Sequence, residues 1–185
     1  KEKPVSGAFL RQDGRICMSI RGKEFPILKA GDIRIPGNHN IENYLAAIAA
    51  VEGLVPPETI RAVAKNFGGV AHRMELVREK DGVSYYNDSI ASSPTRTIAG
   101  LRAFSQKVIL IAGGYDKKIP FDVLGPEIMN HVKALVLVGA TAQKIEDAVR
   151  GAPGFSSVSL PIFRLDTFES AVQKAHDIAV SGDIV

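Results

Sequence analysis

From Ser93 onward, short apolar segments alternate with amphipathic segments of helical length. The segment Val108–Ala112 is continuously apolar, which is typical of a strand that is covered on both faces of its sheet. Repeated strand–helix–strand units with short loops predict a Rossmann-like, doubly wound, mainly parallel α/β sheet. Asp166 and Glu169 predict a capping box for the last helix. The expected helices are Thr95–Phe104, Phe121–His131, Ala142–Arg150 and one ending at Val180, and the expected strands are Val108–Ala112, Ala134–Val138, Ile162–Leu165 and one beginning at Ile184.

The pattern before Gly68-Gly69 is different, and we place a domain boundary there, between residues 1–69 and 70–185. The first part is expected to be a smaller αβ piece, with a β-meander followed by two helices. Directly after the boundary, Asp81-Gly82 predicts a hairpin turn. The expected strands are Val5–Leu10, Ile16–Ile20, Glu24–Leu28, Met74–Arg78 and Val83–Asn87. The expected helices are Ile41–Val51, with Asn40 as its N-cap, and one that starts at Pro56-Pro57-Glu58 and runs to about Phe67.

Composition narrows the function classes. A net charge of +3 gives no reason to expect a nucleic-acid or membrane partner, and the absence of Trp argues against a base-stacking platform. A single cysteine, Cys17, excludes an internal disulfide and fits a reducing cytosol. Because the chain begins at Lys1 without Met and stops where an apolar strand begins, we expect it to be part of a longer protein.

The stretch Tyr85–Arg96 is the strongest candidate for a ligand loop. A β-rich run ends at Asp88, a polar loop follows, and Ser93-Pro94 is typical of an N-cap and first helical position. Strand ends in open α/β sheets are where ligand groups are found, and helix N-termini favour anions. The alternative is an ordinary strand–helix turn in which Asp88 only caps the backbone.

Three further polar groups are candidates, each with a plain structural alternative. Asn40 and Asn43, three residues apart, could hold a nucleotide, or could cap a helix and face solvent. Arg73 suits phosphate or ribose, or an ion pair. Lys117 follows Gly113-Gly114 at the end of the apolar strand, where it could bind an anionic substrate or be a solvated loop lysine.

Several phosphate, nucleotide and metal motifs are missing from this sequence. Val138–Ala142 lacks the G-x-G-x-x-G spacing, no G-x-x-x-x-G-K-[ST] loop occurs, and the four histidines do not have metal-ligand spacing. Taken by themselves, the residues therefore indicate an α/β ligand-binding domain behind a smaller αβ piece.

Four stretches in a fixed order resemble the Mur ligases. They are Gly37–Asn43 (G-x-H-N-x-x-N), Ala71–Glu75 (A-H-R-M-E), Asn87–Ala91 (N-D-S-x-A) and Gly113–Lys117 (G-G-x-D-K). The last two favour the D-glutamate-adding member of the family over its sister enzymes. The resemblance implies a three-domain ATP-dependent ligase, with residues 1–69 as the end of the central ATP-binding domain and residues 70–185 as an incomplete Rossmann-like C-terminal domain.

The same resemblance implies a bacterial, cytoplasmic and monomeric full-length enzyme with no nucleic-acid or membrane partner. ATP with Mg²⁺ would phosphorylate UDP-N-acetylmuramoyl-L-alanine, and the amine of D-glutamate would attack the acyl phosphate. No catalytic residue is assigned, and the phosphate loop and metal ligands would lie outside this chain. By position, the ATP-binding residues would be Asn43, Arg73 and Asp88, with His39 and Asn40 on the adenine side, and the D-glutamate-binding residues would be Lys117 with Ser92 or Ser93.

One position departs from the family pattern. Ile90 stands where many D-glutamate-adding enzymes have a lysine, so a positive charge is missing. Arg96 is the favoured replacement on the D-glutamate side, ahead of Lys118; alternatively, Arg96 is solvated and Ile90 packs under the loop. Two other functions stay open: a sister ligase, such as another Mur ligase or a folylpolyglutamate synthetase, and a stand-alone nucleotide- or amino-acid-binding module.

Overall fold

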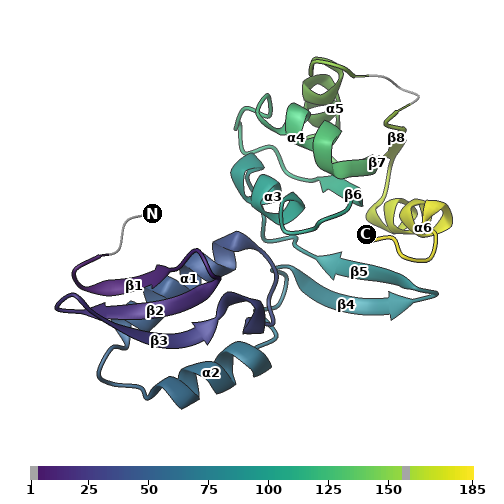
Figure 1. Ribbon diagram of the computed structural model, residues 1–185. Helices are drawn as coiled ribbons and strands as arrows, with labels where there is room; N and C mark the ends of the chain where they lie inside the picture. Colours follow the sequence, from purple (N-terminus) through teal and green to yellow (C-terminus); the bar gives the residue numbers. More distant parts are fainter. Residues whose placement is uncertain (1–3, 156–158) are drawn as a thin grey trace. The chain divides into compact units, whose positions relative to one another are not determined.

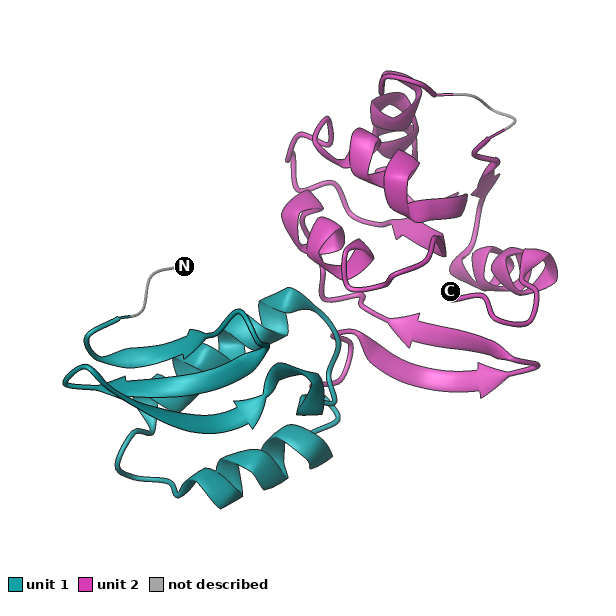
Figure 2. Ribbon diagram, in the orientation of Figure 1, with its two compact units in different colours: residues 1–69 teal, residues 70–185 magenta. Residues whose placement is uncertain are grey.

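The computed structural model describes residues 4–155 and 159–185. The chain forms two compact units, Lys1–Gly69 and Val70–Val185, shown in Figures 1 and 2. Each unit has its own hydrophobic core. Their assignment to particular domains of a ligase stays a prediction.

Unit 1 contains the expected antiparallel meander. Its strands are β1 (Gly7–Leu10), β2 (Arg15–Ile20) and β3 (Lys23–Lys29), followed by a 3-10 turn at Ala30–Asp32. Helices α1 (Asn38–Ala50) and α2 (Pro57–Asn66) contribute Ile48, Ile60 and Ala64 to a core shared with Ile16, Met18 and Leu28 of the sheet.

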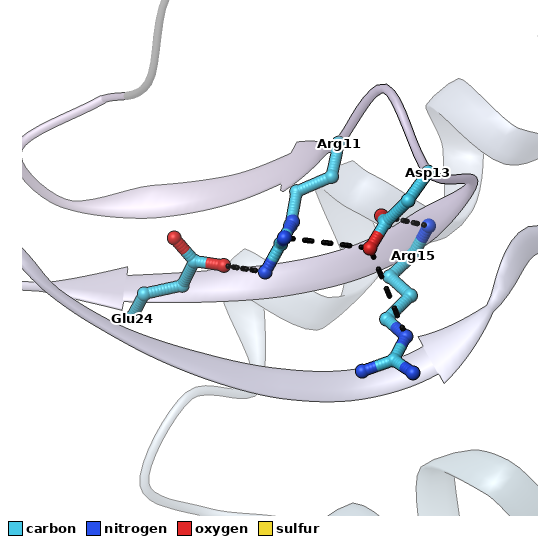
Figure 3. A network of polar contacts seen from close by, with 4 residues as sticks. All are labelled: Arg11, Asp13, Arg15 and Glu24. Atoms are coloured by element: carbon cyan, nitrogen blue, oxygen red, sulfur yellow. Dashed lines mark hydrogen bonds and ion pairs between the residues drawn. The ribbon is translucent and has the colours of Figure 1, made fainter.

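An exposed polar network crosses this sheet near the β1–β2 turn, as Figure 3 shows. Arg11 Nη1 donates to Glu24 Oε1 at 2.9 Å, and Arg11 Nη2 lies 3.4 Å from Asp13 Oδ2. The hydrogen bond to Glu24, with the nearby charge of Asp13, raises the pKa of the Arg11 guanidinium. Beneath it, burial raises the pKa of the Cys17 thiol, so Cys17 behaves as a small core residue. This network stabilises the β1–β2 hairpin. Nothing among its residues indicates a ligand-binding site.

Unit 2 contains the predicted parallel sheet, made of β6 (Val108–Gly113), β7 (Val132–Val138) and β8 (Ile162–Leu165) in that order. The predicted hairpin is also present, as β4 (Glu75–Lys80) and β5 (Val83–Asn87). Asp81 and Gly82 both have positive φ, 54° and 77°, as the mirror-image turn of a two-residue hairpin requires.

The last residues of the chain connect the hairpin to the parallel sheet. Ser84 exchanges backbone hydrogen bonds with Asp183 and Val185 at 3.0 Å, and Ile109 N donates to Ile184 O at 2.8 Å. The segment 183–185 therefore lies between β5 and β6, which confirms the strand expected from Ile184. In Figure 1 the C-terminus lies between these two elements.

Helices cover both faces of the parallel sheet, as predicted. On one face α3 (Pro94–Leu101), α4 (Leu124–His131) and α5 (Ala142–Arg150) pack against alternate residues of β6 and β7. On the other face α6 (Phe168–Ile178) packs through Ala171 and Ala175 against Ile109, Ala134 and Val136. In the described part of the chain, no helix is long and apolar enough to cross a membrane.

Several expected helix ends were wrong, including the start of α4 at Leu124 instead of Phe121 and the end of α6 at Ile178 instead of Val180. Helix α1 begins at Asn38 after Gly37 (φ 101°), so Asn40 lies inside the first turn and is not the N-cap. Helix α3 ends at Leu101, before the expected Phe104. The capping box of α6 is formed by Thr167 and Ser170, whose side chains each bond the backbone of the other residue, and not by Asp166 and Glu169.

Candidate functional site

The loop after β5 is built around Asp88. Its Oδ1 accepts a hydrogen bond from Met74 N at 3.1 Å, and its backbone carbonyl accepts one from Ala91 N at 2.8 Å. A Cβ added to Gly100 of α3 would lie 3.0 Å from Asp88 Oδ2, so the carboxylate is close against that helix. Asp88 therefore braces a junction between the turn before β4, the end of β5 and α3.

The turn that carries Arg73 is joined to this loop at several points. The Asn87 amide nitrogen lies 2.8 Å from His72 Nδ1, and Ile90 N donates to His72 O at 3.2 Å. His72 N donates to Glu75 Oε2 at 2.8 Å. His72 has φ 64°, a left-handed backbone conformation that these three bonds hold in place. Arg73 sits on this braced turn with an exposed side chain.

Ser93 is the N-cap of α3, as predicted, but its side chain makes no capping bond. Its Oγ lies 3.2 Å from Thr95 Oγ1 instead. Ser92 is exposed beside it. Two hydroxyls are thus presented at the start of α3.

Ile90 does not pack under the loop, because 48% of its surface is exposed. Arg96 reaches back over it, with Nη1 3.5 Å from Ile90 O. The part of the alternative that placed Ile90 under the loop is wrong, whereas the part that placed Arg96 in solvent agrees with its exposed position. Whether the Arg96 charge replaces the missing lysine stays a prediction.

The loop after β6 presents Lys117. Gly113 has φ 143°, and a Cβ there would overlap the carbonyl oxygen of Val138, so only glycine fits beside β7. Asp116 is held by Lys144 Nζ at 2.6 Å and by Lys118 N at 2.8 Å. These hydrogen bonds, that from Lys144 first, lower the pKa of the Asp116 carboxyl. Lys117 itself is exposed, and makes no hydrogen bond or ion pair within the described ranges.

A groove of about 670 Å³ opens beside this loop and is lined by α4 and α5. Lys118, Phe121 and Lys144 are among its lining residues, whereas Lys117 and the Asp88 loop are not. The groove and the predicted D-glutamate residues are therefore separate features of unit 2.

The remaining candidates belong to unit 1 and are described within it. Asn40 is buried, and its Nδ2 donates to Pro36 O at 2.6 Å. Asn43 Nδ2 donates to Asn40 Oδ1 at 3.3 Å, and Asn43 is exposed. His39 is half-buried on the same first turn of α1. Asn40 thus supports the turn, while Asn43 is the amide that faces outward.

Among the residues that the structure describes, no group of three or more His, Cys, Asp or Glu side chains could hold a metal ion. Sequence reasoning missed Glu75, Thr141 and Lys144, which hold the two candidate loops. The pairing of Lys144 with Asp116 spans 28 residues, so no local pattern could have indicated it.

The fold and the loops at its strand ends define a Rossmann-like α/β domain that follows a smaller antiparallel unit in the sequence. The chain belongs to the Mur ligase family, since residues 72–185 match the family model described as Mur ligase, glutamate ligase domain.

Two relatives illustrate this similarity. The chain is 55% identical over 181 residues to the UDP-N-acetylmuramoylalanine–D-glutamate ligase of Acetivibrio thermocellus, and 51% identical over 185 residues to that of Clostridium novyi. These alignments cover 97% and 100% of this chain, but only 39% of each relative. The chain therefore spans about two-fifths of the length of these curated relatives.

Solved structures support the fold. A pseudomurein peptide ligase type C from Methanothermus fervidus aligns with a TM-score of 0.63 at 18% identity, covering 99% of this chain and 39% of that one. A murein peptide ligase from Psychrobacter arcticus aligns with a TM-score of 0.58 at 20% identity, covering 96% and 39%. At these identities the likeness concerns the fold alone.

Proposed function

We propose that this chain is part of an ATP-dependent ligase that joins D-glutamate to UDP-N-acetylmuramoyl-L-alanine in peptidoglycan synthesis. The observation that carries the proposal is the 55% identity, over 97% of the chain, to a relative named for that activity. Unit 1 would be the end of the central ATP-binding domain, and unit 2 the C-terminal domain. The complete enzyme would be monomeric and act in the bacterial cytoplasm, without nucleic-acid or membrane partners.

The D-glutamate side of the site rests on Lys117. An exposed ammonium at the carboxyl end of a parallel strand, with no protein carboxylate bound to it in the described structure, is suited to a substrate carboxylate. The hydroxyls of Ser92 and Ser93 would donate hydrogen bonds, and Arg96 would supply a second positive charge. All four lie on unit 2, on loops or a first helical turn.

The ATP side rests on Arg73 and Asp88. A guanidinium suits phosphate oxygens, and a carboxylate suits ribose hydroxyls or a metal-bound water. The chemistry of this donor set fits a nucleotide. In unit 1, Asn43 would contribute an outward-facing amide, with His39 and Asn40 on the adenine side and Asn40 acting as the support for Asn43.

When bound, ATP and Mg²⁺ would supply the phosphoryl group and the charge neutralisation that phosphoryl transfer needs. The residues of this chain would bind and orient the substrates, because it contains no phosphate loop. The isolated 185-residue chain should accordingly bind ATP weakly, with a dissociation constant above the micromolar range.

The test uses a full-length enzyme that contains this chain. Phosphate release that depends on UDP-N-acetylmuramoyl-L-alanine should require D-glutamate, and should be far slower with L-glutamate, meso-diaminopimelate or L-alanine. A preference for one of the other amino acids would make it a sister ligase. Nucleotide binding without coupling to any of them would make it a binding module. Calorimetry of the isolated chain with ATP completes the test. Tight binding of ATP would contradict the proposal that the phosphate loop lies outside this chain.

A further inference from the structure

The loop that presents Lys117 is anchored at its start to the β7–α5 junction. Gly114 N donates to Val138 O at 3.1 Å, and Gly114 O accepts from both Thr141 N at 3.1 Å and Thr141 Oγ1 at 3.3 Å. Backbone bonds in both directions fix the chain as it leaves β6.

The end of the loop is anchored by one carboxylate. Asp116 Oδ1 accepts from Lys118 N at 2.8 Å, and Asp116 Oδ2 accepts from Lys144 Nζ, in the first turn of α5, at 2.6 Å. Lys118 has φ 58°, so the chain turns sharply directly after Lys117. The same aspartate thus folds the loop and ties it to a helix.

Two side chains project between these anchors without a partner in the described structure. Tyr115 is 85% exposed, and Lys117 is exposed. A lysine has four rotatable bonds, and ordering it is costly unless its backbone is already fixed. The anchored loop provides that fixed starting point.

We propose that Lys144 is a positioning residue for the D-glutamate carboxylate, acting through Asp116 on Lys117. This inference rests on the proposed function. Lys144 does two things: it holds the loop, and it occupies the Asp116 carboxylate. Without Lys144, Asp116 would keep the hydrogen bond from Lys118 N but lose its cationic partner. Its charge, one residue from Lys117, would then attract that ammonium and repel an incoming carboxylate.

This second action has a distinctive consequence. Removing Lys144 alone should raise KM for D-glutamate more than removing the charge of Asp116 alone, because only the first change leaves a carboxylate that competes for Lys117. Asp116→Asn also keeps a side-chain oxygen to accept from Lys118 N. Changing both residues should therefore recover the affinity for D-glutamate that Lys144→Met loses.

The experiment measures KM for D-glutamate, KM for ATP and kcat in the full-length ligase. Lys144→Met should raise KM for D-glutamate about tenfold, while kcat and KM for ATP stay within about twofold. Lys144→Arg should remain within about threefold of the wild type, since it keeps the ion pair. Asp116→Asn/Lys144→Met should return to the level of Asp116→Asn.

Arg150→Met is the matched control, because Arg150 pairs with Glu146 on the same helix and, among the described residues, makes no hydrogen bond or ion pair to the loop. It should lower the melting temperature without changing KM for D-glutamate. An unchanged KM in Lys144→Met, or a double variant as poor as Lys144→Met, would overturn the inference while the ligase activity stands. A wild-type enzyme with no D-glutamate-dependent activity would overturn the proposed function and the inference together.

Discussion

Asp88 Oδ1 accepts a hydrogen bond from the backbone N–H of Met74 at 3.1 Å. Met74 is buried, with 7% of its surface exposed, and its φ of 46° is left-handed. The carboxylate thus stabilises a strained turn. Without it, the backbone N–H of Met74 would be buried without its hydrogen-bond acceptor on Asp88. Asp88 has a structural role as well as a proposed ligand role, and the two can be separated by substitution.

Asp88→Ala should lower the free energy of unfolding of this chain by about 1 kcal/mol, the typical worth of one hydrogen bond. Asp88→Asn should cost less, because the amide oxygen can still accept from Met74 N. Urea denaturation at neutral pH measures both. Equal losses for the two variants would show that the charge, and not the hydrogen bond, stabilises the turn.

In the full-length enzyme, Asp88→Asn should raise KM for ATP by about tenfold or more, the loss of one charge-assisted hydrogen bond. Its melting temperature should remain close to that of the wild type, because the brace to Met74 is kept. Steady-state kinetics with varied ATP tests this. Unchanged ATP kinetics together with a large stability loss would leave Asp88 with the structural role only.

Gly113→Ala should destabilise unit 2 by about 3 kcal/mol, because the new methyl group meets the Val138 carbonyl and the backbone is strained. Gly114→Ala is the control: its φ is 124°, but nothing lies within 4 Å of an added Cβ. It should cost about 1 kcal/mol of backbone strain alone. Thermal and urea unfolding compare the two, and similar losses would mean that strain, not overlap, governs this strand end.

The periodicity of the sequence was sufficient to predict the sheet, because Val108–Ala112 is apolar on both faces and is followed by short helices. Turn chemistry placed the Asp81-Gly82 hairpin, since both residues tolerate the positive φ found there. Asn40 was wrongly predicted to be the N-cap of the first helix, because the N-cap needs a φ of 101° that Gly37 supplies. Thr167 and Ser170 form the capping box that Asp166 and Glu169 also fit by spacing.

The candidate site was predictable only in part. Asp88 and Lys117 were correctly predicted to lie on loops, because each follows the end of a strand and precedes a helix in the sequence. The bonds that orient them come from distant residues: Met74 to Asp88 spans 14 positions and Lys144 to Asp116 spans 28. Such pairings depend on tertiary packing, which no local pattern encodes.

Asp183 should make the stability of unit 2 depend on acid. Burial alone would raise the pKa of this carboxyl, but hydrogen bonds from Lys133, at 2.7 Å, and Val180 N lower it overall. A lowered folded-state pKa gives stability that is present above the unfolded value of about 4 and is lost as pH falls through the folded value. Asp183→Asn should therefore be less stable than the wild type at pH 7, and the difference should shrink below about pH 4 in urea titrations. A constant difference across that range would contradict the linkage.

Arg96 is the residue that we expect to replace the charge missing at Ile90. It lies on the first turn of α3, reaches the Ile90 carbonyl, and is exposed to an incoming anion. A guanidinium at a helix N-terminus adds bidentate contacts to a region that already favours negative charge. In the full-length enzyme, Arg96→Ala should cost about 2 kcal/mol of transition-state stabilisation, the scale of one charged hydrogen bond.

Lys118→Ala is the control for Arg96→Ala and should cost much less, since Lys118 contributes to the loop through its backbone N–H, which alanine retains. Ile90→Lys placed in the Arg96→Ala background should restore most of the lost kcat/KM, because it returns a cation to the same loop. If Arg96→Ala leaves kcat/KM for D-glutamate and ATP within about twofold, its charge does not act on either substrate. If Ile90→Lys fails to recover an impaired Arg96→Ala enzyme, the guanidinium acts through its position on α3 and not as a substitute for the missing lysine.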